Sequence, residues 1–248
     1  MLEEQRIYGL LYLPQEHSEP LPAVIFSHGF GGSHDVGDSY ARALAERGFA
    51  AYCFDFRGGG YGSQSDGSVL EMSIMTEVDD LTAVMDEIRS LPYINADEVF
   101  LMGTSQGGVV SAITAAHHPR DVRGLILLYP AFVLVDTAQQ RFKSAEEIPE
   151  TSFQLWMTVG RAYFEPLLGY DVYADVSAYP KDVLILHGDA DSIVPLSYSE
   201  KAMTAYSSAR LVVIEGAGHG FYGEDEAFAI QNIADYLDAR LHTDSLQN

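Results

Sequence analysis

The feature that most constrains the fold of this 248-residue chain is a regular alternation of short apolar runs and longer segments with helical periodicity. The apolar runs are rich in β-branched and aromatic residues, which favour strands. Strands are expected at residues 7–13, 23–29, 49–56, 98–103, 124–130, 182–188 and 209–216. Helices are expected at residues 38–48, 76–91, 106–118, 197–206 and 224–241. Apolar strands separated by helices predict an α/β fold, with a mainly parallel central sheet covered by helices on both faces and strand 7–13 at an edge.

The alternation stops between residues 131 and 179. Connections in α/β domains are usually short, and this segment is rich in aromatic residues that need a surface to pack on. We therefore expect residues 131–179 to form a small inserted helical cap over the ends of the strands. Residues 1–130 and 180–248 would form the core. The alternative is an elaborated helix that only packs against the core.

The charge balance of the chain argues against nucleic acid as a partner. The chain has 36 acidic residues against 14 lysines and arginines, which gives a formal net charge of −22 at pH 7. Such a surface repels phosphate backbones and anionic membranes. Neither nucleic-acid binding nor attraction to an anionic membrane is therefore expected.

No segment of the sequence has the features of a signal peptide or a membrane span. The stretch MLEEQRIYGLLYLP lacks the basic start, long apolar centre and small-residue cleavage site of a signal peptide. The longest apolar run, LILLYPAFVLV, is too short to span a bilayer and contains a proline. We expect a cytoplasmic protein without membrane insertion. The oligomeric state stays open, with a homodimer as one option.

The residues that commonly bind metals or cofactors show no suitable spacing, so neither a metal nor a cofactor is predicted. The one cysteine, Cys53, lies in the apolar run FAAYCFDF and is expected in the core. The stretch RGGGYGSQSDG matches neither the dinucleotide fingerprint nor the phosphate-binding loop. His28 and His187 precede glycines at strand ends and are expected to support loops. Three further histidines are expected at the surface: His17, His34 and His242.

Serine, histidine and aspartate side chains that could act in catalysis stand in four stretches at the ends of predicted strands: SHGFGG, GTSQGG, HGDADSIVP and GAGHGF. In open α/β sheets, functional groups gather where the strands end at their carboxyl side. In chain order these stretches supply Ser105, then Asp189 or Asp191, then His219. This is the order of the catalytic triad in α/β-hydrolases and differs from the orders in two unrelated serine-protease folds. The residues by themselves leave the choice between the two aspartates open.

Each of these groups has a chemical task in nucleophilic catalysis. The hydroxyl of Ser105 needs an adjacent base, and the imidazole of His219 can take its proton and return it to the leaving group. A carboxylate behind the imidazole fixes its tautomer. Gly103 and Gly107 flank Ser105 as a sharp strand-to-helix turn requires. The backbone N–H groups of Gln106 and Phe30 are the expected donors to the oxyanion.

Taken together, these motifs resemble the α/β-hydrolase superfamily. The acid loop of that superfamily commonly reads H-G-x-x-D-x-x-V-P, and HGDADSIVP places Asp191 at the acid position. The resemblance therefore implies the α/β-hydrolase fold and the triad Ser105, Asp191 and His219. It leaves Asp189 with a role in bracing the loop.

Over nearly the whole chain, the sequence looks like the compact bacterial feruloyl (cinnamoyl) esterases. The shared pieces are HGF, FDFRG, SDG, GTSQGG, HGDAD and GAGHGF, together with a cap of similar size. The resemblance implies a serine carboxylic-ester hydrolase that acts through an acyl-enzyme on hydroxycinnamate esters. It also implies that a cap aspartate and a cap tyrosine hold the phenolic hydroxyl, and Asp136 and Tyr163 stand near those positions. The chain departs from the family at RGGGYG, where the family has a histidine between glycines.

Several alternatives to a feruloyl esterase remain open at this stage. Related acyl esterases and monoacylglycerol lipases share most of the same motifs. A peptidase or thioesterase could use the same triad. A non-catalytic member of the fold could use the cap as a binding surface, although such proteins usually lack a triad residue.

Overall fold

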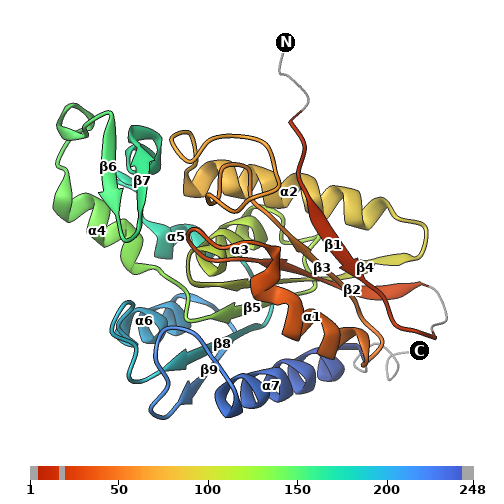
Figure 1. Ribbon diagram of the computed structural model, residues 1–248. Coiled ribbons are helices and arrows are strands. Elements are labelled where there is room, and N and C mark those ends of the chain that lie inside the picture. The colour runs from red at the N-terminus through yellow and green to blue at the C-terminus, as the bar shows by residue number, and fades with distance from the viewer. Residues whose placement is uncertain (1–4, 17–19, 242–248) are drawn as a thin grey trace.

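A seven-stranded, mainly parallel sheet forms the centre of the molecule, as the sequence predicts (Figure 1). The computed structural model describes residues 5–16 and 20–241, so His17, His242 and the first four residues of the N-terminal stretch lie outside it. The strand order is β1-β3-β2-β4-β5-β8-β9, and β1 alone runs antiparallel to its neighbour. The strands are β1 (Gly9–Tyr12), β2 (Leu21–Ser27), β3 (Ala50–Phe54), β4 (Ile94–Thr104), β5 (Gly124–Leu128), β8 (Val183–Gly188) and β9 (Ala209–Ile214).

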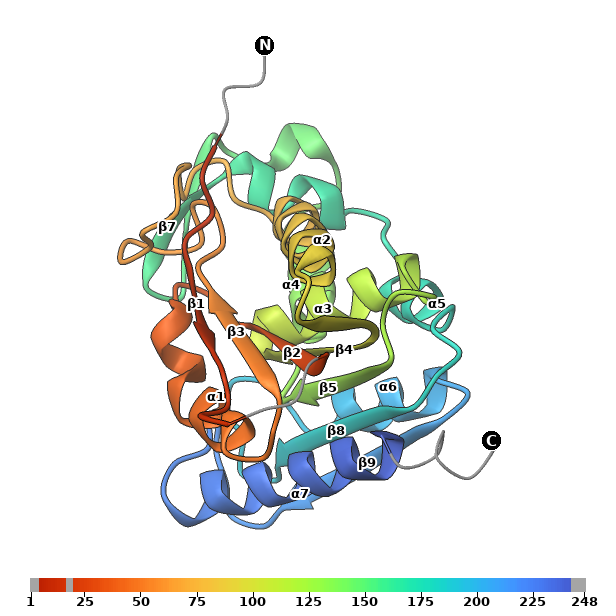
Figure 2. The same ribbon diagram turned by 90° about the vertical axis from the view of Figure 1, so that its right-hand side faces the viewer.

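Helices cover both faces of this sheet because alternate residues of each central strand point to opposite sides. On β2, Ile25 belongs to one apolar cluster, while Val24 and Phe26 belong to the other. The first cluster includes residues of α2 (Ile74–Ser90), α3 (Ser105–His117) and α6 (Ser197–Ala205). The second includes residues of α1 (Asp38–Ala45) and α7 (Glu224–Leu241). Figure 2 shows α7 on one side of the sheet and α2 and α3 on the other.

The segment between β5 and β8 contains a hairpin that the sequence reading missed. It begins with α4 (Val133–Arg141), continues through the antiparallel pair β6 (Thr151–Gln154) and β7 (Met157–Gly160), and ends with α5 (Val172–Val176). The expectation of a helical cap was therefore wrong for residues 151–160, which form two strands. The β6–β7 turn lacks the glycine or asparagine that usually marks such turns, and Leu155 takes a positive φ of 51° instead.

The burial of two side chains, Cys53 and His34, can be compared with what the sequence predicted. Cys53 is fully buried, as expected. His34 is also buried, which corrects its expected place at the surface. Its Nδ1 lies 2.8 Å from the carboxylate of Asp55, which the sequence separates from it by 21 residues. Across the part of the chain that the structure describes, no helix combines the length and apolar character that crossing a bilayer needs.

Candidate active site

The turn between β4 and α3 presents Ser105 at its tip. Ser105 has a positive φ of 50°, which is rare for a residue with a side chain and marks local strain. A Cβ on Gly103 would come within 2.2 Å of the carbonyl oxygen of Gly107, and one on Gly107 would come within 2.3 Å of the carbonyl oxygens of Ser27 and His28. Only glycine fits at these two positions. The glycines that flank Ser105 therefore allow the sharp turn, as the sequence predicted.

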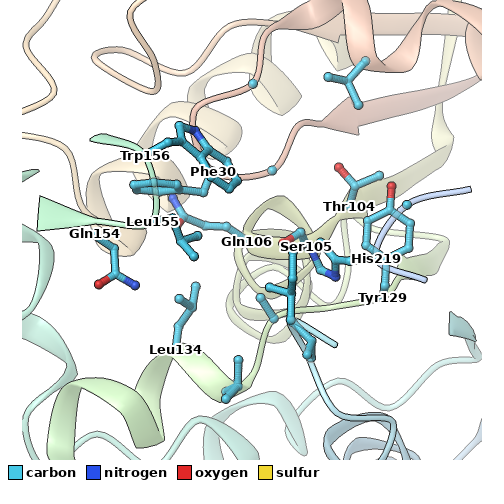
Figure 3. Close-up of a pocket in the computed structure, with 18 of the residues that line it drawn as sticks. Phe30, Thr104, Ser105, Gln106, Tyr129, Leu134, Gln154, Leu155, Trp156 and His219 are labelled. Carbon is cyan, nitrogen blue, oxygen red and sulfur yellow. Dashed lines mark hydrogen bonds between the residues drawn. The ribbon is translucent and has the colours of Figure 1, made fainter. Parts of the chain in front are cut away.

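Three side chains from separate loops meet at this turn. The hydroxyl oxygen of Ser105 lies 2.9 Å from Nε2 of His219, and Nδ1 of His219 lies 2.7 Å from Oδ2 of Asp191. The ring of Tyr129 packs edge-on against the imidazole, with 4.9 Å between ring centroids. Figure 3 shows His219 beside Ser105, with Tyr129 next to it. The structure therefore brings together Ser105, Asp191 and His219.

The surroundings of Asp191 keep its carboxylate ionised. Burial alone would raise the pKa of Asp191, but donated hydrogen bonds outweigh burial and hold that pKa below its usual value. The backbone N–H groups of Ile193 and Val194 both donate to Oδ1 at 2.8 Å, and His219 contacts Oδ2. One oxygen of the carboxylate is thus fixed by the loop, and the other faces the imidazole.

Asp189 and two further histidines support the loops around the site. Oδ1 of Asp189 accepts a hydrogen bond from the backbone N–H of Gly216 at 2.7 Å, which ties the loop after β8 to the loop after β9. Nε2 of His28 accepts a hydrogen bond from the N–H of Phe56, at 3.2 Å. His187 lies 2.7 Å from the hydroxyl of Ser199 and 2.9 Å from the carbonyl of Val194.

Phe30 and Gln106 both line the cavity above Ser105. Gln106 is in the first turn of α3, where backbone N–H groups have no partner within the helix. Within the described residues, no hydrogen bond from the N–H of Phe30 is found, although the next two N–H groups of that loop are bonded. Both N–H groups are therefore available to a ligand.

A cavity of about 450 Å³ opens above Ser105. One side is formed by residues between β5 and β8, which include Leu134, Thr137, Gln154, Leu155 and Trp156. The rings of Phe30 and Trp156 lie 5.6 Å apart at this wall. Figure 3 shows these side chains on the far side of Ser105 from Tyr129. The lining is apolar apart from a few side chains, as in many small-molecule sites.

Asp136 and Tyr163, the residues expected to hold a phenolic hydroxyl, do not line this cavity. Asp136 accepts a hydrogen bond from the hydroxyl of Tyr198 at 2.9 Å. Tyr163 is 1% exposed, and its hydroxyl donates to Oε1 of Gln106 at 2.7 Å. The polar side chains that residues 131–179 place in the lining are instead Thr137 and Gln154, together with the indole of Trp156. This arrangement gives no support to contact of Asp136 or Tyr163 with a substrate.

The sequence analysis did not predict a buried carboxyl beside the site, that of Glu77. Glu77 is 1% exposed, and its Oε2 accepts a hydrogen bond from Nε2 of Gln106 at 2.8 Å. Burial raises the pKa of Glu77 well above its usual value of 4.5. The signal was the position of Glu77 next to the apolar stripe of its helix, but a glutamate there is usually exposed. Among the described residues, no group of three potential metal ligands is found.

Comparisons with known proteins agree with the α/β fold described above. A family model described as serine aminopeptidase, S33, matches residues 18–167, and one described as TAP-like protein matches residues 170–243. The solved structure of Est1E from Butyrivibrio proteoclasticus, with bound ferulic acid, superimposes with a TM-score of 0.88. It is 24% identical, and the match covers 97% of this chain and 98% of that one.

The chain spans only part of the length of the curated relatives that it matches. The uncharacterized protein YfhR of Escherichia coli K12 is 26% identical over 200 residues, which cover 80% of this chain but only 63% of YfhR. The monoacylglycerol lipase ABHD6 of Mus musculus is 22% identical over 268 residues, which cover 90% of this chain and 78% of that protein. The first family model alone matches more than half of the chain. The chain therefore belongs to the family described as serine aminopeptidase, S33, within the α/β-hydrolases.

Proposed function

We propose that this protein is a serine carboxylic-ester hydrolase that works through an acyl-enzyme. The observation that carries the proposal is the continuous hydrogen-bond chain from Ser105 through His219 to Asp191, with distances of 2.9 Å and 2.7 Å. A serine becomes a nucleophile when an adjacent base accepts its proton, and an ionised carboxylate behind the base stabilises the imidazolium that forms.

The mechanism follows from the position of each group. Nε2 of His219 takes the proton as Oγ of Ser105 attacks the ester carbonyl, and the oxygen of the tetrahedral intermediate accepts hydrogen bonds from the N–H groups of Phe30 and Gln106. The carbon–oxygen bond to the alcohol then breaks, and His219 returns the proton to the leaving alcohol. Water, activated by the same histidine, releases the acid from Ser105.

For the acyl group, we propose a hydroxycinnamate such as ferulate. The cavity wall formed by Phe30, Trp156 and Leu155 offers flat apolar surfaces to an aromatic ring. Thr137 and Gln154 are the polar side chains at this wall that could bind the phenolic hydroxyl. The resemblance of Est1E, whose structure holds ferulic acid, supports this choice. We also propose that residues 131–179 act as the cap that shapes this acyl pocket.

A second candidate is an esterase for short or medium aliphatic acyl groups or monoacylglycerols. Leu134 and Leu155 in the lining suit an alkyl chain as well as a ring, and ABHD6 is named a monoacylglycerol lipase. A peptidase is less well supported, even though the family is described as serine aminopeptidase. An aminopeptidase has to bind an ammonium group, and none of the described residues that line the cavity carries a carboxylate.

Two measurements test the proposal. A fluorophosphonate probe should label the wild-type protein and not the Ser105→Ala variant; a folded wild type that resists labelling would point to a binding protein without activity. A panel of methyl ferulate, methyl p-coumarate, chlorogenate and p-nitrophenyl esters of rising acyl length then identifies the acyl group. A preference for p-nitrophenyl butyrate over every hydroxycinnamate would favour the second candidate.

A further inference from the structure

We propose that Glu77 and Tyr163 are positioning residues that clamp the side chain of Gln106 and thereby fix both backbone donors to the oxyanion. This inference rests on the proposed ester hydrolysis and assigns to Tyr163 a task other than binding a phenol.

The clamp has one contact at each end of the Gln106 amide. Nε2 of Gln106 donates to Oε2 of Glu77 at 2.8 Å, and Oε1 of Gln106 accepts from the hydroxyl of Tyr163 at 2.7 Å. All three residues are 1% exposed. They come from three separate parts of the chain, namely α2, the start of α3 and the segment Arg161–Tyr163. Because a buried amide without partners costs free energy, this side chain has one favoured orientation.

Tyr163 contacts both residues that supply the oxyanion donors. Its hydroxyl bonds to Gln106, and its ring packs edge-on against the ring of Phe30, with 5.5 Å between centroids. Phe30 lies in the loop after β2 and Gln106 in the first turn of α3, and the reaction needs their N–H groups at a fixed distance from each other and from Ser105. One tyrosine that contacts both side chains is placed to hold that distance.

Glu77 is held in place by its own helix. The side chain of Ser73 caps α2 by accepting from the N–H of Thr76, while Thr76 accepts from the N–H of Ser73, so the turn that carries Glu77 is fixed. Burial favours the neutral acid at Glu77, and the nearby Asp80 adds to this by its charge. A neutral carboxyl is the form that suits this place, because a negative charge behind the oxyanion donors would oppose the charge that develops there.

The strain at Ser105 explains why Gln106 needs to be held. Ser105 takes a positive φ, and the peptide that follows it carries the N–H of Gln106. A strained turn persists only when its surroundings determine its conformation. The clamp on the side chain of Gln106 is such a determinant, and it acts one residue from the nucleophile.

The test compares Tyr163→Phe and Glu77→Leu with the conservative Glu77→Gln. Tyr163→Phe keeps the ring on Phe30 but leaves Oε1 of Gln106 without its donor. We expect kcat to fall about 10-fold to 100-fold in Tyr163→Phe and Glu77→Leu, with KM within about twofold, since small misplacements of reacting groups have effects of this size. Glu77→Gln still accepts from Gln106 and should keep most of the activity. Tyr179→Phe, a fully buried tyrosine whose hydroxyl donates to Val122, is the matched control and should behave as wild type.

Affinity for a transition-state analogue separates positioning from general damage. A trifluoromethyl ketone forms an oxyanion with Ser105, so its affinity should fall in Tyr163→Phe by the same factor as kcat/KM. Affinity for the free product acid should not change. Thermal unfolding checks that each variant is folded.

Two outcomes would overturn the inference. One is a kcat within twofold of wild type in folded Tyr163→Phe and Glu77→Leu. The other is a rise in KM for ferulate esters alone in Tyr163→Phe, which would return Tyr163 to phenol binding. If instead the wild-type protein hydrolyses no ester of the panel, the proposed function itself fails. That result comes from the wild-type protein and is therefore distinguishable from a failure of the clamp, which the variants measure.

Discussion

Asp189 and Asp191 are two residues apart, yet their carboxylates face different partners: Asp191 contacts the ring of His219, and Asp189 bonds to the backbone of Gly216. This difference sets the ranking of two variants. We expect Asp191→Asn to lower kcat by about 10⁴-fold, because an amide favours the wrong imidazole tautomer. Asp189→Asn keeps an oxygen for the N–H of Gly216 and should lose less than about tenfold. Steady-state kinetics on one ester gives both values, and a reversed ranking would move the acid to Asp189.

Removal of the nucleophile or the base should abolish turnover without unfolding the protein. Ser105→Ala and His219→Ala are each expected to lower kcat by roughly 10⁴-fold to 10⁶-fold, because the residues of such a triad act as a unit. Circular dichroism should show unchanged secondary structure. A His219→Ala variant with near wild-type turnover would mean that another group takes the serine proton.

The cap side of the cavity can be tested by comparing a phenolic substrate with one that lacks the phenol. If Thr137 and Gln154 bind the phenolic hydroxyl, Thr137→Val and Gln154→Leu should raise KM for methyl ferulate and leave KM for methyl cinnamate unchanged. The loss of one such hydrogen bond corresponds to roughly fivefold to tenfold. Asp136→Asn is the neighbouring control, since Asp136 bonds to Tyr198 outside the cavity. A larger effect in Asp136→Asn than in either cavity variant would restore Asp136 to the phenol site.

The buried carboxyl of Glu77 should make stability depend on pH. Because burial raises the pKa of Glu77 in the folded protein, the folded state holds a proton that the unfolded chain releases above about pH 4.5. The folded state therefore loses stability as pH rises from that value toward the raised pKa. Glu77→Gln removes this loss, so its melting temperature should exceed that of wild type at pH 7, and the difference should vanish near pH 4. Parallel curves for the two proteins between pH 4 and pH 8 would contradict this.

The sharp turn at Ser105 should not tolerate a methyl group at Gly103 or at Gly107. Gly103→Ala and Gly107→Ala would each place a Cβ within 2.3 Å of a backbone oxygen, so we expect losses of at least about 3 kcal/mol in the free energy of unfolding. Gly218→Ala is the matched control in the neighbouring loop, since its Cβ would meet no atom within 4 Å. Urea denaturation measures all three. An alanine at position 103 that costs no more than one at position 218 would show that the backbone relaxes.

The central sheet and the meeting of Ser105, Asp191 and His219 could be predicted because their signals are local or fixed by topology. The apolar runs predicted every strand of the main sheet, since a strand buried on both faces has few polar residues. The order of the polar stretches then brought Ser105, an aspartate and His219 to one edge of that sheet. Residues far apart in the chain met because parallel strands end on the same side.

The hairpin and the buried polar contacts could not be predicted, because their causes are not local. The turn at Leu155 and Trp156 has no turn-forming residue, and both side chains are used to line the cavity instead. His34 is buried because Asp55 lies beside it, and Glu77 because Gln106 does. Neither partner stands near its counterpart in the sequence, so the usual expectation of an exposed polar side chain failed at both.

The hairpin of β6 and β7 pairs only with itself and shares no hydrogen-bond ladder with the seven-stranded sheet. Exchanges of its exposed side chains, such as Leu155 and Trp156, would therefore break no hydrogen bond between the main strands, whose ends carry Ser105, His219 and Asp191. If residues 131–179 shape the acyl pocket as proposed, selectivity and chemistry are encoded in separable stretches of the gene. Under that proposal, changes in this short stretch would give new substrates while the reaction centre is inherited intact.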